Sequence, residues 1–269
     1  MEIKKSGSER TDWERHGRGH RLLRYVFVLI GLMTITVSWQ LLGVRYNFVE
    51  ELPREINDVA NRMYPPDYGY APEIISPLME TINISIVGTG LGIVLSVPVA
   101  YIAASNTSPN IVTYALGKLI VTVTRSVNTV IIALILVAIF GPGILAGVLA
   151  IGIRSVGFIG KLLAEEIEEI ERSQQEAIRA TGASEVEVIL YGVVPQIKPG
   201  FIAVSIFRWE INVRGATILG FVGAGGIGVN LLTQISRFNW DAAAVILIAI
   251  AGVVFVSEFV GWYLRKKIN

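Results

Sequence analysis

The chain has 269 residues, of which 52% are hydrophobic and 17% are charged. Soluble domains carry about 25% charged residues, so this composition favours a protein that crosses a membrane several times. The net charge of +1 gives no sign of nucleic-acid binding, and the absence of cysteine excludes disulfides and thiolate metal sites.

Six segments of the sequence are long and apolar enough to span a membrane, which takes about 20 mainly apolar residues. They predict an all-α membrane protein with six transmembrane helices at residues 22–44, 78–104, 114–140, 144–163, 201–222 and 242–264. In the second segment, small residues recur every four positions from Gly88 to Ala104, which predicts close packing against a neighbouring helix. We expect the first segment to remain as a span, because no small-residue cleavage pattern follows it.

Lysine and arginine in the short flanks of the spans indicate the orientation of the chain. Seven of them lie within residues 1–24 and three close the chain at Arg265–Lys267, whereas residues 45–76 hold only three against six acids. Both termini are therefore predicted to be cytoplasmic, in a multi-pass protein of the inner membrane. The predicted organisation is a cytoplasmic tail (1–21), a first transmembrane helix (22–44), an extracytoplasmic segment (45–76) and a main transmembrane domain (77–269).

A short polar segment between the fourth and fifth spans lies on the predicted cytoplasmic side. It contains Glu176, Ala177, Ala180 and Gly182 in the pattern Glu-Ala-x-x-x-x-Gly. Small alanines let a helix enter a groove on a partner, and Glu176 supplies a charge for a cationic group there. We therefore predict a surface that binds a partner protein.

Local signals divide this segment into two short helices. Gly182 allows the left-handed conformation that ends a helix. Ser184 and Glu187 then have the spacing of a capping box, which begins a second helix.

Several charged residues lie within the predicted spans, where each costs about 2.5–3.5 kcal/mol at the bilayer centre. They are Lys118, Arg125, Arg154, Arg208, Glu210, Arg214 and Glu258. Five cations against two anions favour an anionic cargo, because the planar guanidinium group suits phosphonate or phosphate oxygens.

We predict that five of these residues line the substrate pathway: Arg125, Arg154, Arg208, Glu210 and Arg214. The alternative for Glu210 and Arg214, which are four residues apart, is that they neutralise each other on one helix. For the excess positive charge, the alternative to a role in transport is that it pairs with an acidic run on the predicted cytoplasmic side or serves folding alone. That run contains Glu165, Glu166, Glu168, Glu169 and Glu171.

The segment from Gly223 to Gly228 fits the pattern G-x-G-x-x-G. A dinucleotide site needs a preceding strand, whereas an apolar membrane helix precedes this segment and the topology places it outside. We expect a close-packed turn at the outer mouth, with hinge glycines that form an outer gate. The gate glycines are Gly223, Gly225, Gly226 and Gly228.

Enzymatic motifs are absent from the sequence. It has no P-loop pattern and no Ser-His-Asp or Cys-His arrangement, and its two histidines, His16 and His20, have no further ligand nearby. We therefore expect no catalytic site, no metal site and no cofactor in this chain. Energy for transport has to come from another subunit or from an ion gradient.

Four stretches together resemble the permease of phosphonate ATP-binding-cassette (ABC) importers: Gly160–Ile170, Glu176–Gly182, Arg208–Arg214 and Gly223–Gly228. The likeness runs from about residue 63 to the C-terminus. It implies the type I ABC importer permease fold (MetI-like) and a cytoplasmic coupling helix that docks on an ATPase. The sequence departs from the family pattern at three places. Ile178 stands where alanine is common, Gly192–Pro195 reads Gly-Val-Val-Pro where Ile-x-Leu-Pro is common, and Val127 stands where a proline often follows the Arg-Ser pair.

The resemblance also implies the partners. They are a second copy of this chain, two cytoplasmic ABC ATPase subunits that bind ATP and magnesium, an extracytoplasmic phosphonate-binding protein and membrane lipid. The implied cargo includes phosphonates, phosphate esters, phosphite and hypophosphite. The alternatives are a permease of the same type for another small solute such as methionine or a betaine, an ATP-independent secondary transporter or channel, and a membrane scaffold.

Overall fold

The computed structural model describes residues 18–43 and 47–268, which are helical almost throughout and contain no strand. Residues 1–17 of the predicted tail (1–21), with His16, lie outside the described residues, and His20 belongs to the first turn of a helix. The chain divides into two units, Met1–Asp58 and Val59–Asn269. The first contains α1 (Arg18–Leu41) and most of α2 (Asn47–Met63).

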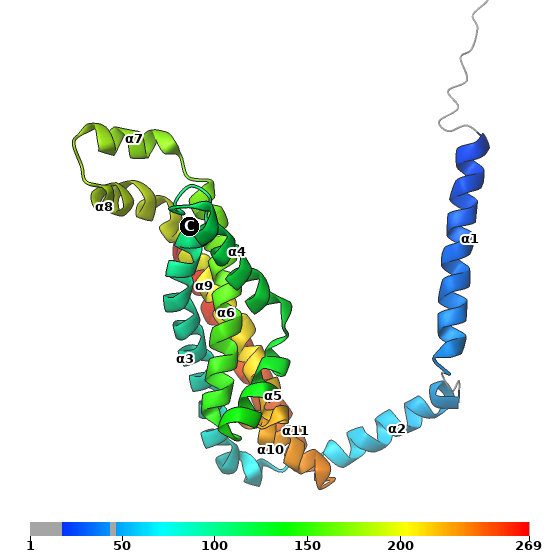
Figure 1. The fold of residues 1–269 in the computed structure, drawn as a ribbon. Coiled ribbons are helices and arrows are strands. Elements are labelled where there is room, and N and C mark those ends of the chain that lie inside the picture. The colour runs from blue at the N-terminus through cyan, green and yellow to red at the C-terminus, as the bar shows by residue number, and fades with distance from the viewer. Residues whose placement is uncertain (1–17, 44–46, 269) are drawn as a thin grey trace, which may run out of the picture. The chain divides into compact units, whose positions relative to one another are not determined.

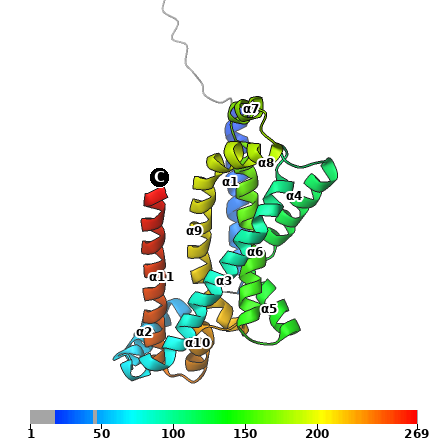
Figure 2. The ribbon, with the colours of Figure 1, turned by 90° about the vertical axis from the view of Figure 1, so that its left-hand side faces the viewer.

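The second unit is a bundle of helices joined by short turns (Figure 1). In chain order its elements are η1 (Tyr68–Tyr70), α3 (Ala71–Ala103), α4 (Ile111–Ser126), α5 (Thr129–Phe140), α6 (Ile144–Glu168), α7 (Arg172–Ala180), α8 (Glu185–Val188), the π-helical η2 (Ile189–Val193), α9 (Val194–Leu219), η3 (Gly220–Val222), α10 (Ile227–Ser236) and α11 (Trp240–Ile268). Figure 2 shows α7 and α8 at one end of the bundle and α10 at the other.

Five segments of the described chain are continuous helices long and apolar enough to cross a membrane. They are Leu22–Leu41, Tyr68–Ala103, Ile144–Glu168, Glu185–Val222 and Trp240–Ile268. The predicted third span differs, because α4 and α5 meet at an angle of 89° and form a bent pair. The count is six when this pair is one span.

The polar sequence at the end of α4 explains the bend. Val127 has an extended backbone, and Asn128 caps α5 by accepting a hydrogen bond from Val130 N at 2.9 Å. An asparagine cap of this kind starts a new helix in a new direction. The prediction of one continuous helix at residues 114–140 was therefore wrong in this detail, although the apolar residues on both sides of the break were correctly assigned to helices.

The packing of α3 on α6 forms the centre of the bundle. The small residues predicted to line one face of α3 are all buried: Gly88, Gly92, Ser96, Ala100 and Ala104. A Cβ atom on Gly88 would lie 2.7 Å from Ile151 Cγ2, so the two backbones approach as closely as glycine permits. The predicted close packing is confirmed.

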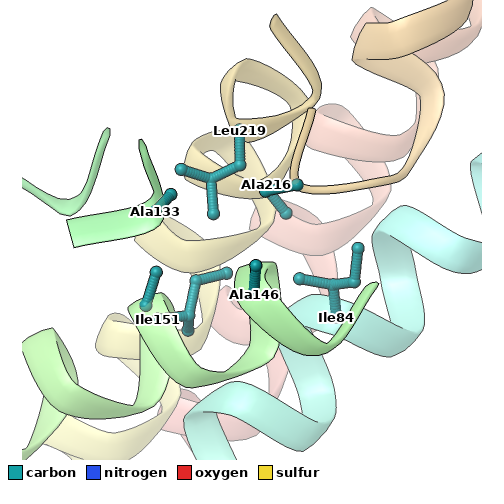
Figure 3. Packing of buried hydrophobic residues seen from close by; sticks show 8 residues of the cluster. Ile84, Ala133, Ala146, Ile151, Ala216 and Leu219 are labelled. Carbon is teal, nitrogen blue, oxygen red and sulfur yellow. The ribbon is translucent and has the colours of Figure 1, made fainter. Parts of the chain in front are cut away.

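Apolar clusters extend this contact to the other helices. Figure 3 shows Ile84 of α3, Ala133 of α5 and Leu219 of α9 packed around Ala146 and Ile151 of α6. At the end of the bundle that holds α10, Ile74, Ile227 and Ile246 join α3, α10 and α11. Four long helices are thereby held around one core, and the charged residues they carry are brought together.

We expect Gly92→Ala to destabilise the protein, because a Cβ atom there would overlap Ser155 Cβ and lie 3.2 Å from Gly152 O. Overpacking of this kind costs about 1–3 kcal/mol. Gly90→Ala is the matched control, because a Cβ atom at Gly90 meets nothing within 4 Å. Thermal unfolding in detergent should show a lower midpoint for the first variant and an unchanged or higher midpoint for the second. Equal midpoints would contradict the packing.

Candidate functional site

The predicted partner-binding segment forms a hairpin of two short helices, α7 and α8, at the end of the bundle (Figures 1 and 2). Gly182 follows α7 with a φ of 83°, the left-handed conformation that favours glycine. Ser184 N donates to Glu187 Oε2 at 2.7 Å, and the Ser184 side chain accepts from Glu187 N, which forms the capping box. Both local predictions are confirmed.

The side chains of the motif face solvent. No residue of α7 is buried, and Glu176, Ala177, Ala180 and Gly182 are all exposed. Within the described chain, the Glu176 carboxylate acts only through its charge on Arg179, in the same helix. The hairpin is free to present its small residues and this carboxylate to another protein.

An ion pair joins the two helices of the hairpin. Arg179 donates from Nε to Glu185 Oε1 at 3.2 Å and from a terminal nitrogen to Glu185 Oε2 at 2.9 Å. This two-point geometry holds both side chains in one orientation. The hydrogen bond to Glu185 and the charge of its carboxylate raise the pKa of Arg179 above its ordinary value. Behind the hairpin, a polar cavity of about 520 Å³ extends towards Tyr101 and Asn106.

Ile178 and Gly192 lie next to each other in the fold. A Cβ atom on Gly192 would lie 3.3 Å from Ile178 Cδ1 and 3.5 Å from Gln175 Cα. Gly192 in η2 therefore leaves room for the larger side chain of Ile178 in α7. This contact packs the hairpin against η2, which leads directly into α9.

A buried polar cluster lies between α3, α6 and α9. Arg208 is 5% exposed, and its Nε donates to Ser155 Oγ at 3.0 Å. Asn212 donates to the same oxygen at 2.9 Å and to Thr89 Oγ1 at 2.8 Å. The ring of Phe158 lies 5.1 Å from Arg208 Cζ, a distance typical of a cation–π contact. Residues from three helices thus fix the position of this guanidinium group.

Sequence reasoning identified Arg208 but missed its hydrogen-bond partners. Ser155, Thr89 and Asn212 are uncharged and occur among apolar residues, so only Asn212, four residues from Arg208, gave a signal. Polar side chains that pack between membrane helices commonly hydrogen-bond across them.

Arg154 has a different position from Arg208. One terminal nitrogen of Arg154 donates to the backbone oxygen of Thr124 at 3.4 Å and to that of Arg125. These carbonyls belong to the last turn of α4, where the helix leaves its oxygens without intrahelical donors. Arg154 therefore stabilises the break before α5, and the Arg125 side chain itself is exposed.

Glu210 and Arg214 do not pair with each other, which corrects the alternative drawn from their spacing. Glu210 accepts from Arg265 at 2.6 Å, and Arg214 lies 3.3 Å from Glu258. Both ion pairs connect α9 to α11. Gly261 of α11 makes this possible, because a Cβ atom there would overlap the carboxylate of Glu210.

These ion pairs change the charge balance of the interior. Lys118 also has an acidic partner, Glu168, at 3.6 Å. Among the charged residues predicted within the spans, the described structure provides no carboxylate partner for Arg125, Arg154 or Arg208. Of these three, Arg208 is the most deeply buried.

The glycine-rich segment forms a turn that packs closely on α3 and α6. Gly223, Gly225 and Gly226 have φ values of 81°, 83° and 80°, which other residues rarely adopt. Ile227 N donates to Thr81 Oγ1 at 2.8 Å, and Gly223 O accepts from Gly143 N at 2.9 Å. The turn lies at the end of the bundle away from α7 and α8. The close-packed turn was predicted correctly, and its role as a gate stays a prediction.

The comparisons with known proteins decide the family. Residues 96–269 match a family described as "Binding-protein-dependent transport system inner membrane component". The chain belongs to this family. It is therefore a multi-pass inner-membrane subunit of a transport system, with the type I ABC importer permease fold.

The relatives agree with this assignment. The chain is 38% identical to the phosphite transport system permease protein PtxC of Stutzerimonas stutzeri, over 91% of this chain and 89% of PtxC. It is 35% identical to the phosphate-import permease protein PhnE of Mycolicibacterium smegmatis, over 78% of this chain and 40% of PhnE. A structure of the MetNI methionine ABC transporter in an inward-facing conformation matches with a TM-score of 0.65 at 20% identity, over 76% of this chain and 99% of that one.

Proposed function

We propose that this chain is the permease of an ATP-driven importer for phosphite- and phosphonate-type anions, including phosphate esters. Its identity to a phosphite transport permease is 38%, whereas its identity to a probable D-methionine permease of Haemophilus influenzae is 25%. This difference supports the anionic cargo over methionine. The methionine transporter structure supports the fold alone.

Arg208 is the observation that carries the proposal of an anionic cargo. Its guanidinium group has five N–H donors, and the hydrogen bond found for it among the described residues uses only Nε. Its two terminal nitrogens remain available for a pair of phosphonate oxygens, in the planar arrangement that arginine favours. We place Arg208 at the centre of the substrate pathway, with Arg125, Arg154, Glu210 and Arg214 around it.

In the proposed importer, transport also needs other subunits. We propose that the exposed α7 docks into a cleft of a cytoplasmic ABC ATPase through Glu176, Ala177, Ala180 and Gly182. The ATPase would bind ATP and magnesium, so we expect no cofactor in this chain. Two copies of the permease would enclose the pathway, and an extracytoplasmic binding protein would deliver the anion.

The proposed mechanism is alternating access in a protein with both termini in the cytoplasm. Closure of the ATPase pair on ATP would move α7, and the bundle would change the side on which the pathway opens. The turn with Gly223, Gly225, Gly226 and Gly228 lies at the far end of the bundle, where an outer gate is needed. Its glycines allow backbone changes that other residues would resist.

Uptake of a radiolabelled phosphonate tests the function. Cells that lack their own phosphonate uptake would receive the chain with its ATPase and binding protein. We expect uptake that requires all three and that unlabelled phosphite reduces. Uptake reduced by methionine or a betaine instead, or uptake without the ATPase, would contradict the proposal.

A further inference from the structure

Helix α2 has one apolar and one polar face. Leu52, Ile56, Val59 and Met63 follow one another at intervals of four, three and four residues, which places them on one side of the helix. Leu52 is 54% exposed and Ile56 is 60% exposed. The opposite side carries Arg54 and Asn61 among other polar residues. Val59 and Met63 are half-buried, so the exposed part of the stripe, at Leu52 and Ile56, is what needs a surface to cover it.

The connections of α2 limit how it can lie relative to a membrane. The α1 span ends at Leu41, five residues before α2 begins at Asn47, and the next span begins at Tyr68, four residues after α2 ends at Met63. An extended chain covers at most about 3.6 Å per step from one Cα to the next, so the six and five steps of the two links reach about 22 and 18 Å. Both ends of α2 therefore stay near the same membrane surface.

The length of α2 favours an orientation along the membrane surface. A helix of 17 residues is about 25 Å long at 1.5 Å per residue. If α2 stood perpendicular to the membrane, its far end would be about 25 Å from the surface, beyond the reach of either link. With its axis along the surface, α2 keeps both ends within reach of the two links and turns one of its faces towards the lipid.

Charge indicates which part of the lipid α2 contacts. The polar residues of α2 include four acids, Glu50, Glu51, Glu55 and Asp58, and two arginines, Arg54 and Arg62, so its side chains sum to −2. A net negative helix gains nothing from anionic headgroups. The favourable contribution to membrane binding is then the burial of the apolar stripe at the boundary between headgroups and acyl chains.

We propose that α2 is an interfacial helix that lies in the membrane surface between the first two spans. Its stripe of Leu52, Ile56, Val59 and Met63 contacts acyl chains, and its acidic side faces water. The two short links keep the helix at the surface, so even modest apolar burial holds it there. This proposal does not depend on the identity of the cargo.

Single cysteines provide a direct test, because the chain has no cysteine of its own. The full-length chain would carry Leu52→Cys or Ile56→Cys on the apolar face, or Arg54→Cys or Asn61→Cys as matched controls on the polar face. Each variant would be labelled with a polarity-sensitive fluorophore and reconstituted into phosphatidylcholine vesicles. Quenching by nitroxide-labelled lipid and by aqueous iodide would be measured separately.

We expect lipid quenching and blue-shifted emission at positions 52 and 56, and iodide quenching at positions 54 and 61. Adding anionic lipid should not strengthen the lipid quenching. Iodide quenching at all four positions would overturn the proposal, because the helix would then be in water. Protection of positions 52 and 56 from both quenchers would also overturn it, because protein would then cover the stripe.

Discussion

Uptake should be lost when the charge of Glu176 is reversed in a Glu176→Arg variant, while the permease still folds and inserts into the membrane. Glu176 is exposed on α7 and makes no hydrogen bond or ion pair to the described chain. Its proposed role is to meet a cationic group on the ATPase, and a like charge there costs several kcal/mol at a buried contact. ATP hydrolysis by the complex should then no longer drive uptake.

The measurement combines uptake in cells with ATPase activity and co-purification of the ATPase. Glu169→Arg is the matched control, because Glu169 is an exposed acid of the same cytoplasmic segment outside the motif. It should leave uptake close to the unmodified level. Normal uptake by Glu176→Arg in cells without another copy of the permease would remove α7 from its proposed docking role.

The second large effect is expected at Arg208. An Arg208→Ala variant removes the buried guanidinium group that we place in the substrate pathway, along with its hydrogen bond to Ser155. The hydrogen bond that matters for uptake is the one between the guanidinium group and the transported anion. A hydrogen bond to a charged group contributes about 1.5–3 kcal/mol, which corresponds to roughly a ten- to hundredfold change in binding. Uptake should fall by about this factor. Co-purification with the ATPase should be retained, because α7 is distant in the bundle.

Two further variants separate charge from packing at this site. Lys161→Ala removes a cation that forms only a half-exposed ion pair with Glu165, so uptake should change little. Arg208→Lys keeps the positive charge but loses the planar arrangement of donors, and should restore only part of the uptake. Unchanged uptake in Arg208→Ala would remove this residue from the pathway.

The α7–α8 hairpin could be predicted from the sequence because its signals are local. Gly182 and the pair Ser184 and Glu187 act within one or two helical turns, so their spacing alone predicts the end of one helix and the start of the next. The apolar spans were equally accessible, since length and composition determine them.

Interactions between distant residues could not be predicted in this way. Glu210 has a cation four residues away in the sequence, yet its partner in the fold is Arg265, 55 residues away. Which cation pairs with Glu210 depends on how α9 and α11 cross and on the space that Gly261 leaves. Neither can be inferred from a local sequence pattern. At the bend between α4 and α5, the contact from Arg154 of α6 to the last turn of α4 is likewise a long-range one, although the bend itself follows from the local sequence.

The close contact between Ile178 and Gly192 has a consequence for chimeric permeases. A graft that replaces the hairpin with that of a relative transfers the first residue, and the second follows 14 positions later. In relatives with the common pattern, alanine and isoleucine are expected at these two positions. A junction between them would then give either two bulky side chains in one volume or two small ones around a void. Swaps intended to change the cognate ATPase should therefore carry both positions in one piece.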